Sequence, residues 1–153
     1  MTLIDTLAGI EDEPAIDNSL EFAMPLPPIG CSPNTHRHWR YKAAAVKQYR
    51  SDCFLMAKSQ YGGTTIGQRV RLSFDWYMAK RLSNVYDGLY RPKDTDNAIA
   101  AIKPLIDGLR DAGILADDNH QHVEIGRVNL YRTKASHKGR CAIVLRIEEV
   151  LNA

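Results

Sequence analysis

The chain has 153 residues, of which 44% are hydrophobic and 25% are charged, and its formal net charge at pH 7 is +2. This length and composition predict one globular domain with a substantial core. No apolar run approaches the roughly 18 residues of a membrane span, and the sequence does not open with a secretory signal. The three cysteines are widely spaced and form no CxxC pair. They indicate reduced thiols in a cytoplasmic protein rather than a disulfide framework or a zinc site.

The charge is unevenly divided along the chain. Residues 1–36 hold six acidic side chains and no Lys or Arg, so the other 117 residues hold all 20 basic side chains against 12 acidic ones, a balance of +8. We expect residues 1–20 to be an acidic, flexible arm and residues 21–153 to be the single folded domain. A basic body suits an anionic polymer such as DNA, although an unevenly charged solvated surface explains the composition equally well.

Hydrophobic periodicity predicts six elements in the order strand, helix, strand, helix, strand, strand. The predicted strands are 20–24, 68–79, 123–132 and 141–150, and the predicted helices are 41–60 and 96–112. Residues 68–79 alternate most clearly, whereas the alternation of 123–132 breaks beside Gly126 and predicts a bulge. A short basic turn should join the last two strands into a hairpin. The fold class is therefore α+β, a small mixed sheet with two helices.

The second predicted helix lies inside the most informative stretch, residues 91–120. Asp94 and Asp96 precede it, Lys103 lies on its polar flank, and Asp117 and Asp118 follow it. We expect Asp96 to be the N-cap, Pro104 to kink the helix and Gly113 to end it. Lys103 lies two turns after Asp96, about 10 Å along the axis, so the side chain or the kink must cover that gap.

Carboxylates spaced in this way predict a site for a hard divalent cation. Asp94, Asp96 and one of Asp117 and Asp118 offer the oxygen ligands that Mg²⁺ or Mn²⁺ prefers. Such a metal activates water and stabilises charge on a phosphoryl oxygen, and Lys103 would add positive charge beside it. Each motif alone is more often a cap or a loop, but the two motifs together with a helical lysine favour a catalytic site.

The same residues resemble a known family. The order DTDN, then Lys103 with Asp107 four residues later, then Gly-Leu and a closing Asp-Asp pair is similar to the RusA-type Holliday junction resolvases of bacteria and their prophages. The segment LPPIGCSPN also resembles the N-terminal region of that family. The resemblance implies a homodimer that binds a four-way DNA junction and makes paired symmetric nicks with Mg²⁺. It assigns Asp94, Asp96 and Asp118 (or its neighbour Asp117) as the three catalytic aspartates.

The lysine departs from the family pattern. Better-known members place it three residues after the asparagine, where this chain has Ala100, whereas Lys103 comes six residues after Asn97. A shift of three residues keeps nearly the same helical row and adds one turn of distance. We therefore expect Lys103 to be the catalytic lysine, with Lys93 or Arg91 as substitutes if it does not reach the phosphate.

Basic side chains outside this stretch are candidates for phosphate contacts. With Arg91 and Lys93, the DNA-binding candidates are Arg37, Arg40, Lys80, Arg81, Lys134 and Lys138. Trp39, Tyr86 and Tyr90 are candidates for stacking on opened bases, whereas Trp76 fits the core better. The pairs His36/His38 and His120/His122 lack an evident third zinc ligand. No phosphate-binding GxxxxGK[ST] motif occurs, so we expect no nucleotide cofactor.

The sequence thus predicts a Mg²⁺-dependent endonuclease that resolves four-way branched DNA as a homodimer, without membrane association. A nuclease acting on flaps or forks remains an alternative. A protein that binds junctions without cutting them is a second alternative, which the displaced lysine keeps open.

Overall fold

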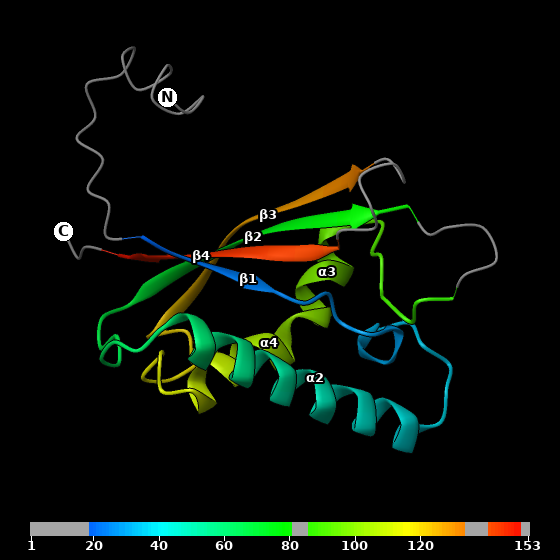
Figure 1. The fold of residues 1–153 in the computed structure, drawn as a ribbon, viewed down its shortest axis with the longest axis horizontal. Coiled ribbons are helices and arrows are strands. Elements are labelled where there is room, and N and C mark those ends of the chain that lie inside the picture. Colours follow the sequence, from blue (N-terminus) through cyan, green and yellow to red (C-terminus); the bar gives the residue numbers. More distant parts are fainter. Residues whose placement is uncertain (1–18, 81–85, 134–140, 151–153) are drawn as a thin grey trace, which may run out of the picture.

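The computed structural model describes residues 19–80, 86–133 and 141–150, which form one mixed sheet with helices on one face (Figure 1). The elements are β1 (Leu20–Met24), the 3₁₀ helix η1 (Ile29–Cys31), α2 (Trp39–Gln60), β2 (Val70–Ala79), α3 (Thr95–Ala101), α4 (Lys103–Asp111), β3 (Val123–Thr133) and β4 (Ala142–Glu149). This arrangement confirms the α+β fold class. Most of the predicted acidic arm, residues 1–18, lies outside the described residues.

The sheet has the strand order β1-β4-β2-β3. β2 runs parallel to β3 and antiparallel to β4, and β4 also pairs antiparallel with β1. The predicted hairpin of the last two strands is therefore wrong, because β2 lies between β3 and β4. Burial explains the order: Ile143, Leu145 and Ile147 of β4 are at most 1% exposed, whereas most side chains of β3 are half-buried or exposed. The more apolar strand takes an interior position and β3 takes the edge.

The predicted bulge in β3 is confirmed. The pairing of β2 with β3 shifts between Leu72, opposite Ile125, and Phe74, opposite Val128, so β3 holds one extra residue there. A Cβ on Gly126 would stand 2.7 Å from Oγ of Ser73 and 2.8 Å from Cγ of Arg71. A larger residue here would have to displace the side chains of Ser73 and Arg71 where the bulge brings the two strands together.

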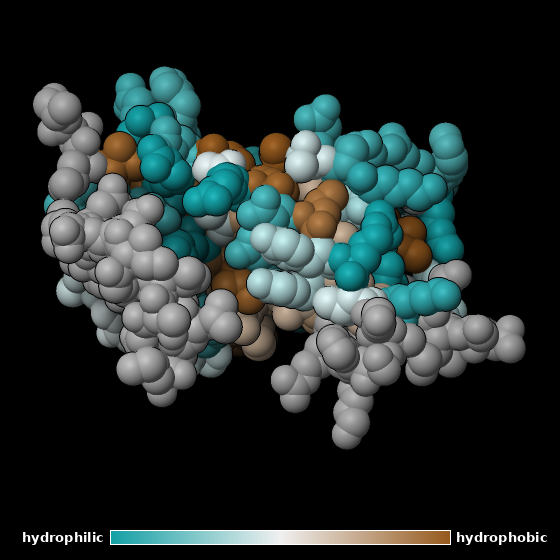
Figure 2. Space-filling view, turned by 90° about the horizontal axis from the view of Figure 1, so that it is seen from above, coloured by the Kyte–Doolittle hydropathy of each residue, from teal (hydrophilic) through white to brown (hydrophobic). Residues whose placement is uncertain are grey.

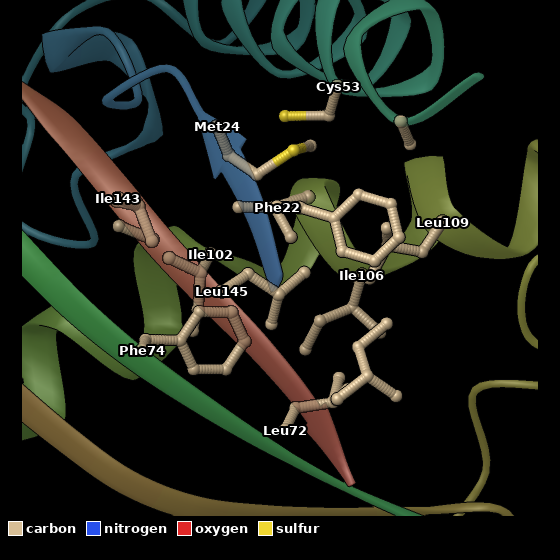
Figure 3. Close-up of a cluster of buried hydrophobic side chains, with 14 of the residues drawn as sticks. Phe22, Met24, Cys53, Leu72, Phe74, Ile102, Ile106, Leu109, Ile143 and Leu145 are labelled. Carbon is tan, nitrogen blue, oxygen red and sulfur yellow. The ribbon is translucent and has the colours of Figure 1, made fainter. Parts of the chain in front are cut away.

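The core lies between the sheet and the helices. β1, β2 and β4 contribute alternate side chains to it, and α2, α3 and α4 cover them (Figure 3). Phe74, Ile102 and Leu145 meet at its centre, and each is fully buried. The opposite face of the sheet is mainly hydrophilic, with scattered hydrophobic residues, where it is seen from above in Figure 2.

Helix α2 is held at only part of its length. Its buried residues are Tyr49, Cys53 and Ala57, an i, i+4 row that faces the core. The three- to four-residue spacing of apolar side chains along this helix predicts Met56, with Leu55 as an option, on the buried stripe, but they are 40% and 60% exposed, so this prediction is wrong. The helix begins at Trp39, two residues before the predicted start, and no residue of its first ten is buried.

The cysteines are free thiols, as the sequence predicted. Burial raises the pKa of Cys53 to about 12 and that of Cys31 to about 11, so both stay protonated at neutral pH. No helix among the described residues is long and apolar enough to cross a membrane.

Candidate active site

The first acidic pair stands at the start of α3. Asp94 is the N-cap: its Oδ1 accepts a bond of 2.9 Å from the Asn97 backbone N–H, and its Oδ2 accepts one of 3.2 Å from Asn97 Nδ2. The predicted N-cap, Asp96, is wrong by two residues, since Asp96 lies inside the first turn with its side chain exposed. Asp94 satisfies an otherwise unpaired N–H, and Asp96 complements the positive end of the helix.

The predicted kink at Pro104 is a break between two helices. Ile102 leaves helical geometry at φ −93° and ψ 2°, and α4 begins at Lys103 with Pro104 in its first turn. Proline lacks the N–H that would continue the helical bonding and crowds the preceding turn, so the chain restarts here. The break places Lys103 at the N-terminus of a new helix instead of in the middle of a long one.

Lys103 is the centre of an ion-pair network. Its Nζ lies 2.8 Å from Asp107 Oδ1, one turn along α4, and 2.5 Å from Asp118 Oδ2, which comes from the loop before β3. Arg110 binds the other oxygen of Asp118 at 3.1 Å. The carboxylates are the shielded partners, with Asp118 15% and Asp107 18% exposed, whereas the side chain of Lys103 is 59% exposed.

These contacts set the charge states of the network. The hydrogen bond from Lys103 is the main reason that the pKa of Asp118 lies well below the ordinary carboxyl range. Burial alone would lower the pKa of Lys103, but its bonds to Asp107 and Asp118 outweigh this effect and raise that pKa. At neutral pH Lys103 is therefore an ammonium ion and Asp118 a carboxylate.

Helix α4 is braced against α2 beneath this network. Arg50 of α2 binds Asp111 through two hydrogen bonds, of 2.5 and 2.8 Å, and lies 3.9 Å from Asp107. A Cβ on Gly108 would stand 2.9 Å from the backbone oxygen of Arg50, so only glycine allows the two helices to approach this closely. The bonds thus fix the row that carries Asp107 relative to the core.

The C-terminal end of α4 turns the chain back toward Asp117 and Asp118. Gly113, with φ 74°, donates to the Arg110 carbonyl, and the next residue donates to the Leu109 carbonyl, which together form a Schellman cap. The chain then turns back, and Asp117 Oδ1 accepts from the backbone N–H of Asp118 at 2.7 Å. Asp117 thus shapes the loop, whereas Asp118 is the member of the pair that faces Lys103.

The acidic residues suit a hard cation by chemistry but are not gathered around one point. Asp94, Asp96 and Asp118 offer only oxygen donors, as Mg²⁺ requires. Yet Asp94 caps the start of α3, whereas Asp118 lies in the loop before β3 and contacts Lys103, the first residue of α4. Among the described residues no three or more His, Cys, Asp or Glu side chains are placed to hold one metal ion together.

The predicted phosphate contacts fall into three groups. Arg37, Arg40, Lys80 and Lys93 are exposed. Arg91 is engaged in the fold, because it binds Asp87 at 2.6 Å and the carbonyl of Ala79 at 2.9 Å. The remaining candidates lie outside the described residues: Arg81, Lys134 and Lys138.

The aromatic candidates differ in exposure, and two of the histidine candidates make hydrogen bonds within the fold. Trp39 and Tyr86 are 67% and 61% exposed, whereas Trp76 is fully buried, as its strand position predicted. His122 hydrogen-bonds Asn119 at 2.8 Å, and His38 is the N-cap of α2.

Arg110 and Arg50 belong to the site but were missed in the sequence. Arg110 follows Lys103 and Asp107 at helical spacing, so the pattern K-x₃-D-x₂-R offers a signal for it. Arg50 is 61 residues from Asp111 in the chain, and no local pattern connects them.

The chain matches no protein-family model and no curated protein.

Proposed function

We propose that this protein is a Mg²⁺-dependent, structure-specific endonuclease that resolves four-way DNA junctions by paired symmetric nicks. The observation that carries the proposal is the placement of Lys103 against Asp118, 2.5 Å apart, on the segment that also begins with Asp94 and Asp96. A protonated amine beside several carboxylates, on a chain whose residues 37–153 carry +8, suits a reaction at a phosphodiester.

The proposal gives each residue of the segment a role. Asp94, Asp96 and Asp118 would hold Mg²⁺, or Mn²⁺, with Asp117 supporting the loop; the metal, when bound, supplies water activation and charge neutralisation at the phosphate. Lys103 places positive charge where the phosphoryl oxygens gain negative charge. Asp107 and Arg110 keep Lys103 and Asp118 in position from the same face of α4.

Substrate contacts outside the segment follow from exposure. Arg37, Arg40, Lys80 and Lys93 are free to bind phosphates, which would position the DNA without reading its sequence. Two nicks in opposed strands require two active sites, so the proposal includes a homodimer. The proposal includes a cytoplasmic location in a bacterium, with the protein encoded by the host or by a phage; the three free thiols support it.

A second candidate function is junction binding without cleavage. The observation that favours it is that Asp94 and Asp118 are held by different groups, Asp94 by Asn97 and Asp118 by Lys103 and Arg110. A binder needs the basic surface but not the convergence of carboxylates, and it would tolerate the loss of any one aspartate.

A gel assay on labelled synthetic DNA separates these functions. The purified protein is incubated with a four-way junction, a flap and a linear duplex, each with Mg²⁺ and with EDTA, beside Asp96→Asn. We expect symmetric nicks in the junction that require Mg²⁺ and disappear in the variant. Nicks mainly in the flap would indicate the looser nuclease, and tight junction binding with no nicks in Mg²⁺ or Mn²⁺ would indicate the binder.

A further inference from the structure

Five consecutive residues at the start of α2 form an exposed cluster of rings and cations, which we call the aromatic–arginine cluster, residues 37–41. The Arg40 guanidinium lies 5.4 Å from the centre of the Trp39 ring, and the Arg37 guanidinium lies 4.7 Å from that of Tyr41. The His38 ring lies 5.6 Å from Trp39 and is tilted by 32°. A large aromatic face is thus presented to solvent between positive charges.

The fold gives no structural reason for this exposure. Trp39 is 67% exposed, although a tryptophan ring buries a large apolar area when it joins a core. This end of α2 extends beyond the sheet in Figure 1, away from the helical row that packs on the core. A large apolar ring left exposed at a solvated helix end is typical of a recognition surface.

Contacts with η1 and the N-cap of α2 hold the backbone of the cluster. The 3₁₀ helix η1 packs against it, and a Cβ on Gly30 would stand 3.2 Å from Cε1 of Tyr41. His38 accepts the Arg40 backbone N–H at 3.2 Å, which fixes the first turn. The backbone that carries Trp39 is therefore fixed before any partner arrives, which lowers the ordering needed on binding.

The surrounding charge favours an anionic partner. No Asp or Glu occurs between residues 22 and 51, a stretch that holds five Lys and Arg residues. No described carboxylate pairs with Arg37 or Arg40, so their charges are available to phosphates. Aromatic faces flanked by arginines bind unpaired bases by stacking while the arginines contact the backbone.

We propose that the aromatic–arginine cluster is a stacking platform for an unpaired base of branched DNA, with Trp39 as the stacking ring. This inference rests on the proposed function and adds to it the feature of the substrate that is recognised. A linear duplex keeps its bases inside the stack, whereas a branch point exposes or frays them, so the platform selects branched DNA over duplex.

Binding measured without cleavage tests the platform. The full chain, Trp39→Ala, Trp39→Phe and Leu55→Ala are titrated, in EDTA, into a fluorescent four-way junction and a linear duplex of matched sequence. We expect Trp39→Ala to weaken junction binding about 5- to 150-fold, the range expected for one stacked base, and duplex binding less than about twofold. Trp39→Phe should recover most of the affinity. Leu55, 60% exposed on the same helix, is the matched control and should have no effect.

The outcomes separate the inference from the proposed function. A Trp39→Ala variant that binds the junction as the wild type does, or loses junction and duplex affinity equally, overturns the platform while the nuclease proposal stands. A wild-type chain that does not prefer the junction to the duplex overturns the proposed function and the platform with it. Circular dichroism of each variant verifies that the exposed substitutions leave the fold intact.

Discussion

The acidic residues at the two ends of the stretch 94–118 are held in different ways. Asp94 is fixed by bonds to Asn97, three residues away, and Asp96 beside it is exposed. Asp118 is fixed by Lys103, 15 residues away, and by Arg110. One end is thus a local helix cap and the other is a tertiary ion-pair network. A stretch that reads as one motif in the sequence is two structural units in the fold.

A substitution at Gly108 should disturb the close packing of α4 against α2, which supports the ion-pair network. Gly108→Ala should lower the free energy of unfolding by about 1–3 kcal/mol, because the added Cβ meets the Arg50 carbonyl at 2.9 Å. Helix propensity alone predicts the opposite sign, a gain of about 1 kcal/mol. Urea denaturation measures the difference. Gly67→Ala, where a Cβ meets nothing within 4 Å, is the control, and a stabilised Gly108→Ala would refute the close helix contact.

Asp118, within the ion-pair network, should contribute more to stability than the exposed Asp96. Asp118→Asn should cost about 1–2 kcal/mol, less than buried charged hydrogen bonds usually contribute, because Lys103 is 59% exposed. Asp96→Asn should stay within about 0.5 kcal/mol of the wild type. Equal effects of the two substitutions in urea denaturation would remove the distinction between the two ends.

The local end has its own signature. Asp94→Ala should cost about 1 kcal/mol through loss of the N-cap, and Asp94→Ser should restore most of it. Thermal melts of the three proteins measure both effects. If Asp94→Ser is as unstable as Asp94→Ala, the role of Asp94 is not that of a cap.

Acid should weaken the ion-pair network around Asp118. The pKa of Asp118 is lower in the folded chain than in the unfolded one, so its contribution is complete above the unfolded value near 4 and is lost as the pH falls below that value toward the depressed folded one. Between pH 4 and pH 3 the wild type should lose up to about 1 kcal/mol more than Asp118→Asn. Parallel urea titrations at each pH measure this, and identical slopes would contradict the depressed pKa.

The sequence was informative wherever a feature depends on near neighbours. The bulge at Gly126 and the stop at Gly113 follow from glycine chemistry and agree with the prediction, whereas Pro104 is predicted to kink one helix and instead stands where a second helix begins. The pairing of Lys103 with Asp107 follows from helical spacing. The hairpin of β3 and β4 was predicted wrongly, because local turn signals do not say that β2 will pair between them. Arg50 was missed for the same reason, since its partners are distant in the chain.

Cleavage by variants of Asp94 and Asp118 tests most directly whether the two acidic pairs form one active site. Asp94→Asn and Asp118→Asn are compared with the wild type on a saturating amount of four-way junction in Mg²⁺, with binding measured separately in EDTA. We expect both variants to cut at least about 100-fold more slowly while binding the junction within about threefold of the wild type. Wild-type cleavage by Asp94→Asn, with loss only in Asp118→Asn, would contradict a site shared between the two ends.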